Sequence, residues 1–271
     1  MKLYRNYTYS NKRQIWRIIP GGPDKLVIEE RNPVTREVFF SCIDMNSGNV
    51  LLENLQFDEK FWIGIEEVYK DVIFFHNYQK PDMPGHADII AYDINKKEVI
   101  WRSDKYLFSL VYDNKIYCFR NFFERQKYYQ LDYYTGELIS ELGDDFNQIG
   151  HLRELRETEL YKGYRFPEVF NHPVKEIDSI IEELRTEVLI SGKIDYFVTG
   201  NLLLLSYHTV LDDGKLRNNF RTLDISTKMV IFEEILNKEI TNYIPDSFFL
   251  INDLVFLLKE KETLFVFLIN D

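Results

Sequence analysis

One segment of the chain, residues 76–88, carries the residue types that bind metal ions. It contains His76, Asp82, His86 and Asp88 in the run HNYQKPDMPGHAD. Imidazole and carboxylate groups are zinc ligands, but metal motifs place them at fixed short spacings on defined turns. The two prolines and the glycine of this run are ordinary loop residues instead. The sequence therefore predicts a surface loop that holds no metal ion.

Two adjacent carboxylates, Glu66 and Glu67, fall in a predicted strand, where a carboxylate pair would suggest glycoside cleavage. That chemistry needs an acid and a base about 5 to 9 Å apart with separate roles. The sequence places no second carboxylate opposite either residue. We therefore expect a solvated polar strand end, with a hydrolase or lyase acting at an axial channel as the alternative.

Three arginines, Arg31, Arg120 and Arg125, lie at or beside predicted loops. A guanidinium group there binds a carboxylate or phosphate through two hydrogen bonds. Since the chain has 44 acidic and 33 basic residues, the favoured interpretation is that these arginines form surface ion pairs. Trp16 and Trp62 are expected to pack between neighbouring repeats, because large aromatic side chains dominate protein cores.

Motifs of known enzyme classes are missing from the sequence, which contains no glycine-rich phosphate loop, nucleophile elbow or His-Glu-x-x-His helix. Cys42 and Cys118 fall in predicted strands and are expected to be buried free thiols. We therefore expect no catalytic residue and no cofactor. The sequence favours a protein that is not an enzyme.

The charge balance and hydropathy of the chain exclude two classes of partner. A net charge of −11 repels phosphate backbones and anionic membrane surfaces, so we expect no nucleic-acid or membrane partner. The first residues show no continuous apolar stretch, and no later segment reaches the roughly 18 apolar residues of a membrane span. The chain is thus expected to be cytoplasmic, and its oligomeric state is left open.

The elements that position these residues recur along the chain. An Asp closes an apolar strand, a Ser, Lys or Thr follows three residues later, and Val or Leu follows six residues later. The four Asp residues are Asp44, Asp93, Asp132 and Asp224, and Asp271 stands where a fifth would fall. A unit that recurs about every 40 to 50 residues is typical of a β-propeller.

Tight turns give a second, independent landmark, since each of five turn sites precedes a strongly apolar strand. These sites are residues 22–25, 70–71, 113–114, 200–201 and 252–253. Both landmarks agree on five repeats. They span about 15–55, 60–103, 106–143, 194–236 and 246–271.

The last repeat lacks its outermost strand, while the strand-like segment 3–10 has no repeat of its own. An unpaired sheet edge promotes aggregation, so this segment is predicted to complete the last sheet and close the ring. Residues 147–193 break the pattern. Ile177, Ile181 and Leu184 follow helical spacing there, which predicts an inserted helix of about four turns. The prediction is an all-β, five-bladed propeller in one domain, 1–271, with a helical insertion at 147–193 between blades three and four.

The repeats CIDMNSGNVLL, AYDINKKEVIW, QLDYYTGELIS and TLDISTKMVIF resemble those of quinoprotein-like (PQQ-like) β-propellers. In that family an Asp and a Thr-Gly turn precede a Val/Leu strand that often ends in Trp, as at Ile100 and Trp101. The resemblance covers four of the five repeats. Quinone-dependent members use more repeats, a calcium ion and commonly an adjacent cysteine pair, so no cofactor residue carries over. The resemblance implies an uncharacterised bacterial propeller.

Function is expected on the face that carries the insertion, because loops on a rigid scaffold bind partners. We interpret the chain as a non-enzymatic scaffold for an unknown protein or peptide, with a small-ligand sensor as a further alternative. The candidate contact residues on that face are Arg31, Arg36, His76, His86, Arg120, Arg125, Asp212 and Asp213.

Overall fold

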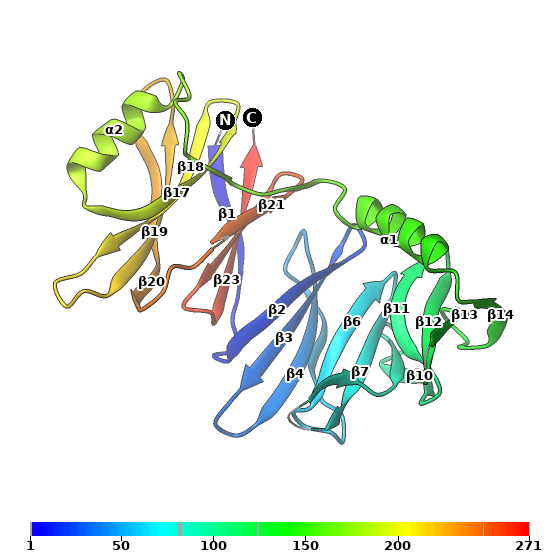
Figure 1. The fold of residues 1–271 in the computed structure, drawn as a ribbon. Helices are drawn as coiled ribbons and strands as arrows, with labels where there is room; N and C mark the ends of the chain where they lie inside the picture. Colours follow the sequence, from blue (N-terminus) through cyan, green and yellow to red (C-terminus); the bar gives the residue numbers. More distant parts are fainter. Residues whose placement is uncertain (1, 81–82, 124, 246, 271) are drawn as a thin grey trace. The chain divides into compact units, whose positions relative to one another are not determined.

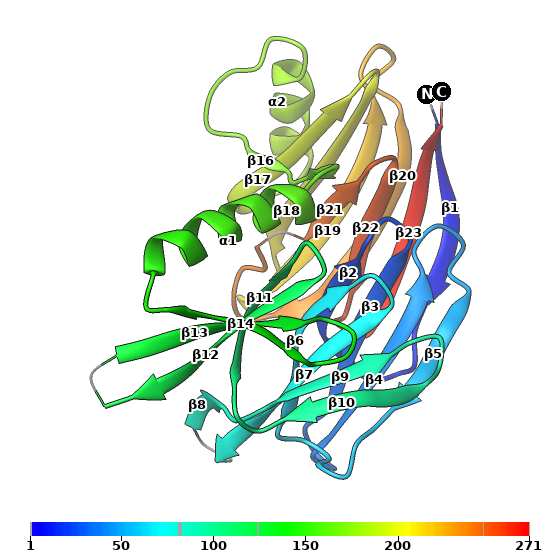
Figure 2. The same cartoon turned by 90° about the vertical axis from the view of Figure 1, so that its right-hand side faces the viewer.

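The computed structural model describes residues 2–80, 83–123, 125–245 and 247–270 (Figure 1). The chain forms two compact units, one of residues 1–12 with 163–271 and the other of residues 13–162. Five antiparallel sheets of four or five strands make up most of both units (Figure 2). The prediction of a mostly β chain is therefore confirmed.

The unit of residues 13–162 contains three sheets of consecutive strands. The first is β2 (Gln14–Gly21), β3 (Lys25–Asn32), β4 (Glu37–Asp44) and β5 (Val50–Leu55). The second is β6 (Ile63–Tyr69), β7 (Val72–Lys80), β9 (Ile89–Asp93) and β10 (Glu98–Ser103), with β8 (Met83–His86) paired to β7. The third is β11 (Leu107–Tyr112), β12 (Lys115–Phe122), β13 (Arg125–Asp132) and β14 (Leu138–Gly143).

The other unit contains two sheets of five strands. One is β16 (Glu168–Val169), β17 (Ile190–Thr199), β18 (Leu202–Val210), β19 (Leu216–Asp224) and β20 (Val230–Ile240). The second has the order β1 (Lys2–Tyr9), β23 (Thr263–Asn270), β22 (Leu254–Lys259), β21 (Phe248–Ile251) and β15 (Tyr164–Arg165). Each predicted repeat thus corresponds to one sheet.

The repeated Asp is a local turn cap, which explains its spacing. Asp44 Oδ1 accepts hydrogen bonds from the backbone N–H groups of Asn46 and Ser47, at 3.1 and 2.7 Å. The same oxygen at the other three sites accepts from the N–H three residues later, at 2.8 Å in each case. An Asp side chain mimics a backbone turn in this way. Asp271 lies outside the described residues.

All five predicted tight turns join the first two long strands of a sheet. Several of their residues have positive φ, which Gly and Asn adopt with little strain. Examples are Gly22 (69°), Gly200 (53°), Asn114 (60°) and Asn252 (53°). The sequence therefore specified these hairpins through local turn chemistry.

Replacing Asp224 with Asn will make the stability of the chain less dependent on acid pH. Hydrogen bonds from Ser226 and Thr227 lower the pKa of Asp224 from 3.8 to about 2. Because the folded pKa lies below the unfolded one, the stabilisation is full above pH 4 and is lost as the pH falls towards 2. Urea unfolding across this range will show wild type and D224N converging at low pH. As a control, D212N replaces an exposed Asp, and its free energy of unfolding should differ from that of wild type by the same amount at every pH. A constant difference for D224N as well would mean that the cap has no role.

The N-terminal strand completes the last sheet, as predicted. Strand β1 runs antiparallel to β23 from Lys2 opposite Asn270 to Tyr9 opposite Leu264. Figures 1 and 2 place the two chain ends side by side. The Ser10 hydroxyl donates to the Glu262 carbonyl at 3.1 Å, which fixes the end of the strand.

The insertion differs from the single helix predicted for residues 147–193. It holds two helices, α1 (Phe146–Leu160) and α2 (Asp178–Glu187), and the short strands β15 and β16. Helix α2 corresponds to the predicted helix but is shorter than four turns. Helix α1 belongs to the unit of residues 13–162 and its apolar residues form no single face, so periodicity did not reveal it. Within the described residues, neither helix is long and apolar enough to span a membrane.

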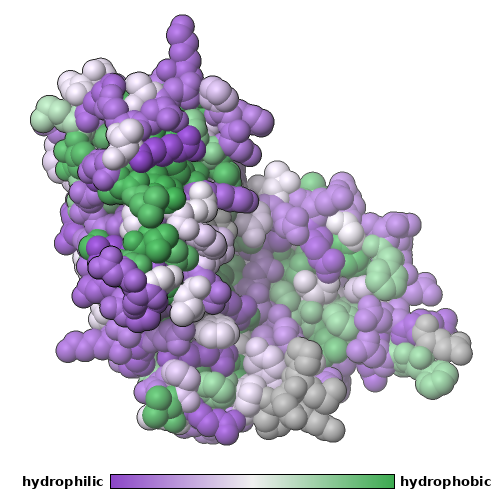
Figure 3. Space-filling view, turned by 60° about the vertical axis from the view of Figure 1, so that its left-hand side comes forward, coloured by the Kyte–Doolittle hydropathy of each residue, from purple (hydrophilic) through white to green (hydrophobic). Residues whose placement is uncertain are grey.

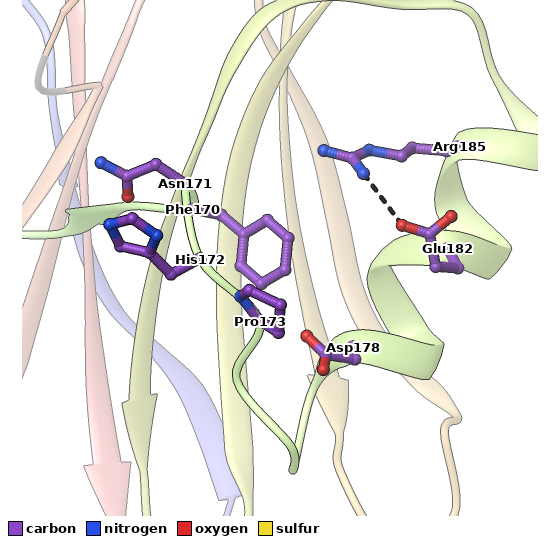
Figure 4. A pocket seen from close by; sticks show the side chains of 7 residues that line it. All are labelled: Phe170, Asn171, His172, Pro173, Asp178, Glu182 and Arg185. Atoms are coloured by element: carbon purple, nitrogen blue, oxygen red, sulfur yellow. Dashed lines mark hydrogen bonds and ion pairs between the residues drawn. The ribbon is translucent and has the colours of Figure 1, made fainter.

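Helix α2 packs its apolar face onto the sheet of β16–β20. Ile177, Ile180, Ile181 and Leu184 are buried there against Tyr207 and its neighbours on the strands. Three polar side chains of the helix, Asp178, Glu182 and Arg185, line a pocket beside Phe170 (Figure 4). Helix α2 is thus part of the hydrophobic core of its own unit, so deleting residues 174–188 would unfold a sheet as well as remove a surface.

Replacing Ile181 with Ala will destabilise the unit that contains α2 by about 2 to 4 kcal/mol, because it leaves a cavity in a fully buried site. The matched control is E182A on the same helix, whose side chain is 68% exposed and should cost under about 0.5 kcal/mol. Denaturant unfolding measures both values. Equal costs for the two variants would contradict this packing.

The other buried clusters consist of residues that alternate along the strands, and both thiols lie among them. Cys42 and Cys118 are fully buried and free, as predicted. Burial raises the pKa of each thiol to about 12. In the face shown in Figure 3, the surface is mainly polar, with apolar side chains gathered in patches.

Candidate functional site

Residues predicted to form a loop after His76 form a hairpin instead. Strand β7 continues to Lys80 and β8 returns along it, with His86 opposite Tyr78. The prediction of an irregular loop over 77–88 was therefore wrong for these strands, since the backbone pairs despite its prolines. Asp82 lies outside the described residues.

The hairpin brings two histidines to one carboxylate, a cluster we call the His–Glu cluster: Glu66, His76 and His86. Glu66 Oε1 lies 2.6 Å from His86 Nδ1 and 3.1 Å from His76 Nδ1. The two imidazole rings stack, with centroids 3.4 Å apart and planes at 8°. These residues are the one group in the described chain whose nitrogen and oxygen atoms lie close enough to share a metal ion.

Strand register explains how Glu66 joins the cluster. In the β6–β7 pairing Ile65 lies opposite Phe75 and Glu67 opposite Phe74, so Glu66 is the extra residue of a β-bulge. A bulge re-aims the side chain that it carries. Sequence alternation alone does not reveal a bulge, which is why sequence analysis read Glu66 as a solvated strand end.

The charges of the cluster are unevenly distributed. Burial alone would raise the pKa of Glu66, but the adjacent His76 and the hydrogen bond with His86 outweigh it and lower the pKa to about 2. Glu66 is therefore a carboxylate at neutral pH. The side chain of His76 is 3% exposed and that of His86 is 37% exposed, so the cluster opens to solvent on one side.

Glu67 has a separate environment and does not converge with Glu66. Its Oε1 accepts a hydrogen bond from Arg156 Nε at 2.5 Å, and its Oε2 accepts one from the Val111 N–H at 3.4 Å. Burial raises the pKa of Glu67, and Arg156 only partly counters this effect. The two carboxylates therefore serve different structures, and the geometry gives no pair for glycoside cleavage.

Beside the cluster lies a second feature, which we call the aromatic–arginine patch: Arg36, Phe61, Trp62 and Tyr78. The Arg36 guanidinium lies 5.6 Å from the ring centroids of both Phe61 and Trp62. Trp62 meets Phe61 and Tyr78 edge to face, at 5.2 and 6.1 Å. Tyr78 in turn contacts the rings of both histidines. The patch and the His–Glu cluster are thus continuous.

The backbone beneath the patch is held by hydrogen bonds. Glu59 Oε1 accepts from the N–H groups of Phe61 and Trp62 at 2.9 Å each. The Tyr78 N–H donates to the Trp62 carbonyl at 2.9 Å. Arg36 is exposed, with φ of 55°, and forms no ion pair among the described residues.

The remaining predicted contact residues fall elsewhere. Arg31 is 9% exposed and is bound to Glu29 and to two backbone carbonyls. Arg120 and Arg125 are exposed on β12 and β13. Asp212 and Asp213 lie in the other unit, on the turn between β18 and β19, where Asp213 pairs with Lys215.

Trp16 does not pack between sheets as predicted. It is 58% exposed, with the Arg31 guanidinium 5.6 Å from its ring centroid. That prediction was therefore wrong. Trp62 is half-buried within the aromatic–arginine patch, so its surroundings are aromatic although it lies at the surface.

Two pockets lie in the unit of residues 163–271. One, of about 430 Å³, lies between residues 170–173 and helix α2 (Figure 4). Its Arg185 pairs with Glu182 at 2.9 Å, and its Asp178 accepts from the Val174 N–H. The second, of about 480 Å³, contains the buried His208, whose Nε2 accepts from the Ile244 N–H. Burial lowers the pKa of His208. His172 lines the first pocket, and His151 is exposed on α1.

Comparison with known proteins adds little on function. Residues 20–101, under a third of the chain, match a family model described as a domain of unknown function (DUF4905). No curated protein matches the sequence. The resemblance to PQQ-like repeats stays a prediction.

Solved structures similar to the chain include the Dos1 propeller, at 9% identity and a TM-score of 0.32, covering 94% of this chain and 68% of that one. Another is the complex of KlAtg21 with the coiled coil of AgAtg16, at 8% identity and a TM-score of 0.31, covering 93% and 69%. At these scores neither likeness carries an argument about function.

Proposed function

We propose that the chain is a five-bladed β-propeller of one domain, and a non-enzymatic scaffold that binds a protein partner through the aromatic–arginine patch. The five sheets and the pairing of β1 with β23 support the propeller. Cytoplasmic location remains a prediction from the sequence. The eight contact residues predicted from the sequence remain candidates for partner binding. Among them, the patch favours Arg36.

The observation that carries this function is an exposed arginine, with no ion pair among the described residues, that lies over two half-buried aromatic rings whose backbone is bonded by Glu59. Tryptophan, tyrosine and arginine dominate the energetics of protein interfaces. A preordered surface also loses less side-chain entropy on binding. Arg36 forms no ion pair with a carboxylate among the described residues and acts on Glu59 only as a nearby charge, so the patch fits a peptide segment that supplies a carboxylate beside an apolar side chain.

Selection from a peptide-display library against the purified chain tests this function. We expect enrichment of peptides with Asp or Glu next to an aromatic or aliphatic residue. In fluorescence polarisation, their affinity should fall at least about 10-fold for W62A and for R36A, as for hot-spot residues.

The matched controls are F123A and R125A, which remove an exposed aromatic and an exposed arginine from the β12–β13 hairpin of the same unit. Both should bind the selected peptides like wild type. Peptides that bind W62A and R36A as tightly as wild type would refute the role of the patch, as would a selection without any enrichment.

A further inference from the structure

The His–Glu cluster has the chemistry of a ligand site, because its three side chains offer donors to a cation from three adjoining strands. The bulge at Glu66 and the β7–β8 hairpin place one carboxylate oxygen and two imidazoles together. Imidazole and carboxylate form the ligand set of many zinc and iron sites. An ordinary surface ion pair needs only one cation and one carboxylate, whereas three side chains come together here.

His76 provides a second, independent observation. It is 2% exposed, and neither of its ring nitrogens makes a hydrogen bond within the described residues. Its Nδ1 lies 3.1 Å from Glu66 Oε1, but the pair lacks hydrogen-bond geometry. Buried polar atoms are almost always satisfied, so an unsatisfied imidazole calls for an explanation.

The fold makes room for this imidazole. Gly64 lies opposite His76 in the β6–β7 register. A Cβ atom at Gly64 would stand 3.1 Å from both Cε1 and Nε2 of His76, which is tighter than ordinary contact. Glycine at position 64 therefore leaves space for the buried His76 ring. Hydrogen bonds among the described residues do not explain why a histidine is buried there.

The spacing of the donors is close to that of a tetrahedral ion. Donor atoms about 2.1 Å from zinc stand roughly 3.3 Å apart in tetrahedral geometry. Glu66 Oε1 lies 3.1 Å from His76 Nδ1 and 2.6 Å from His86 Nδ1, and the ligand atoms of all three residues lie within 4.8 Å of one another. His86 is the more exposed histidine, on the short strand β8, which leaves it free to adjust.

We propose that Glu66, His76 and His86 bind one divalent transition-metal ion, with zinc as the best fit. Two imidazoles select such ions over Mg²⁺ and Ca²⁺, which prefer oxygen ligands. Three protein ligands leave the remaining coordination position to water or to a ligand atom, as in open zinc sites. The Tyr78 ring of the aromatic–arginine patch lies 5.8 Å from the His86 ring, centroid to centroid, so the cluster adjoins the patch.

Titration with ZnCl₂ after chelator treatment tests the proposal on the full chain without any partner. Calorimetry should give one Zn²⁺ per chain, and excess Mg²⁺ should not displace it. The ion should also raise the melting temperature, because it binds only the folded state. Co²⁺ in place of Zn²⁺ should give the visible absorption of a low-coordinate site with imidazole ligands.

The variants E66Q and H86A should weaken zinc binding by at least about 100-fold and abolish the thermal shift. H151A is the matched control, since it removes an exposed histidine from the same unit, and it should bind like wild type. E66Q keeps the shape of the side chain, so its fold is checked by circular dichroism. If the wild type binds no stoichiometric zinc, or if E66Q and H86A bind zinc as tightly as the wild type, the proposal is overturned.

Discussion

Removing residues 1–10 will lower the melting temperature of the unit that contains β23 by about 6 to 20 °C. The deletion removes the antiparallel ladder from Lys2 to Tyr9, together with buried Tyr9 and the packing of Leu3 on the core. Each backbone hydrogen bond contributes about 0.5 to 1.5 kcal/mol net. After the entropy of ordering the strand, we expect a net loss of about 3 to 5 kcal/mol. One kcal/mol corresponds to about 2 to 4 °C in a domain of this size.

A peptide of residues 1–10 added to the truncated chain provides the control. It should pair with β23 by strand addition and restore most of the lost stability, whereas a scrambled peptide should not. The truncated chain should also aggregate on heating, because β23 becomes a free edge beside apolar side chains. A truncated chain that melts like the full chain contradicts the role of this strand.

The parts of the fold that sequence analysis predicted well are those encoded by local contacts. Asp93 and its equivalents all accept a hydrogen bond from the N–H three residues later, so the motif and its structure share a spacing. The five hairpin turns depend likewise on residues that tolerate positive φ. Even the pairing of the two chain ends followed from counting strands, because one repeat was short by one.

Contacts between distant residues explain what sequence analysis missed. Strands β15 and β16 have two residues each and exist because they pair with β21 and β17. Helix α1 has no apolar stripe, and its buried residues are only Ile149 and Arg156. No periodicity search finds a helix held by one isoleucine and one ion pair.

The candidate functional site shows the same difference between features set by local contacts and features set by distant ones. Sequence analysis selected His76 and His86 by residue type but rejected a metal site, because their spacing matches no compact motif. Their common partner Glu66 precedes His76 by ten residues and reaches it only through the β-bulge. The aromatic–arginine patch also depends on non-local packing, since Arg36 lies on the β3–β4 turn and Trp62 lies in the connection before β6.

Replacing Arg156 with Met will destabilise the unit of residues 13–162 by about 3 to 5 kcal/mol, because it leaves Glu67 as a buried carboxylate without its cation. Arg156 is 7% exposed, its Nε lies 2.5 Å from Glu67 Oε1, and its guanidinium lies 5.2 Å from the Tyr69 ring centroid. Denaturant unfolding at neutral pH measures the loss. R153M on the same helix removes an exposed arginine bonded to Ser109 and should cost under about 0.5 kcal/mol.

A double-mutant cycle separates the ion pair from the packing of the Arg156 side chain. E67Q in the R156M background removes the unpaired charge, so the double variant should recover at least about 2 kcal/mol relative to R156M alone. Additive losses would instead mean that the two side chains act independently. A coupled result shows that helix α1 is held to β6 through a buried charge pair, which accounts for a stable helix without an apolar face.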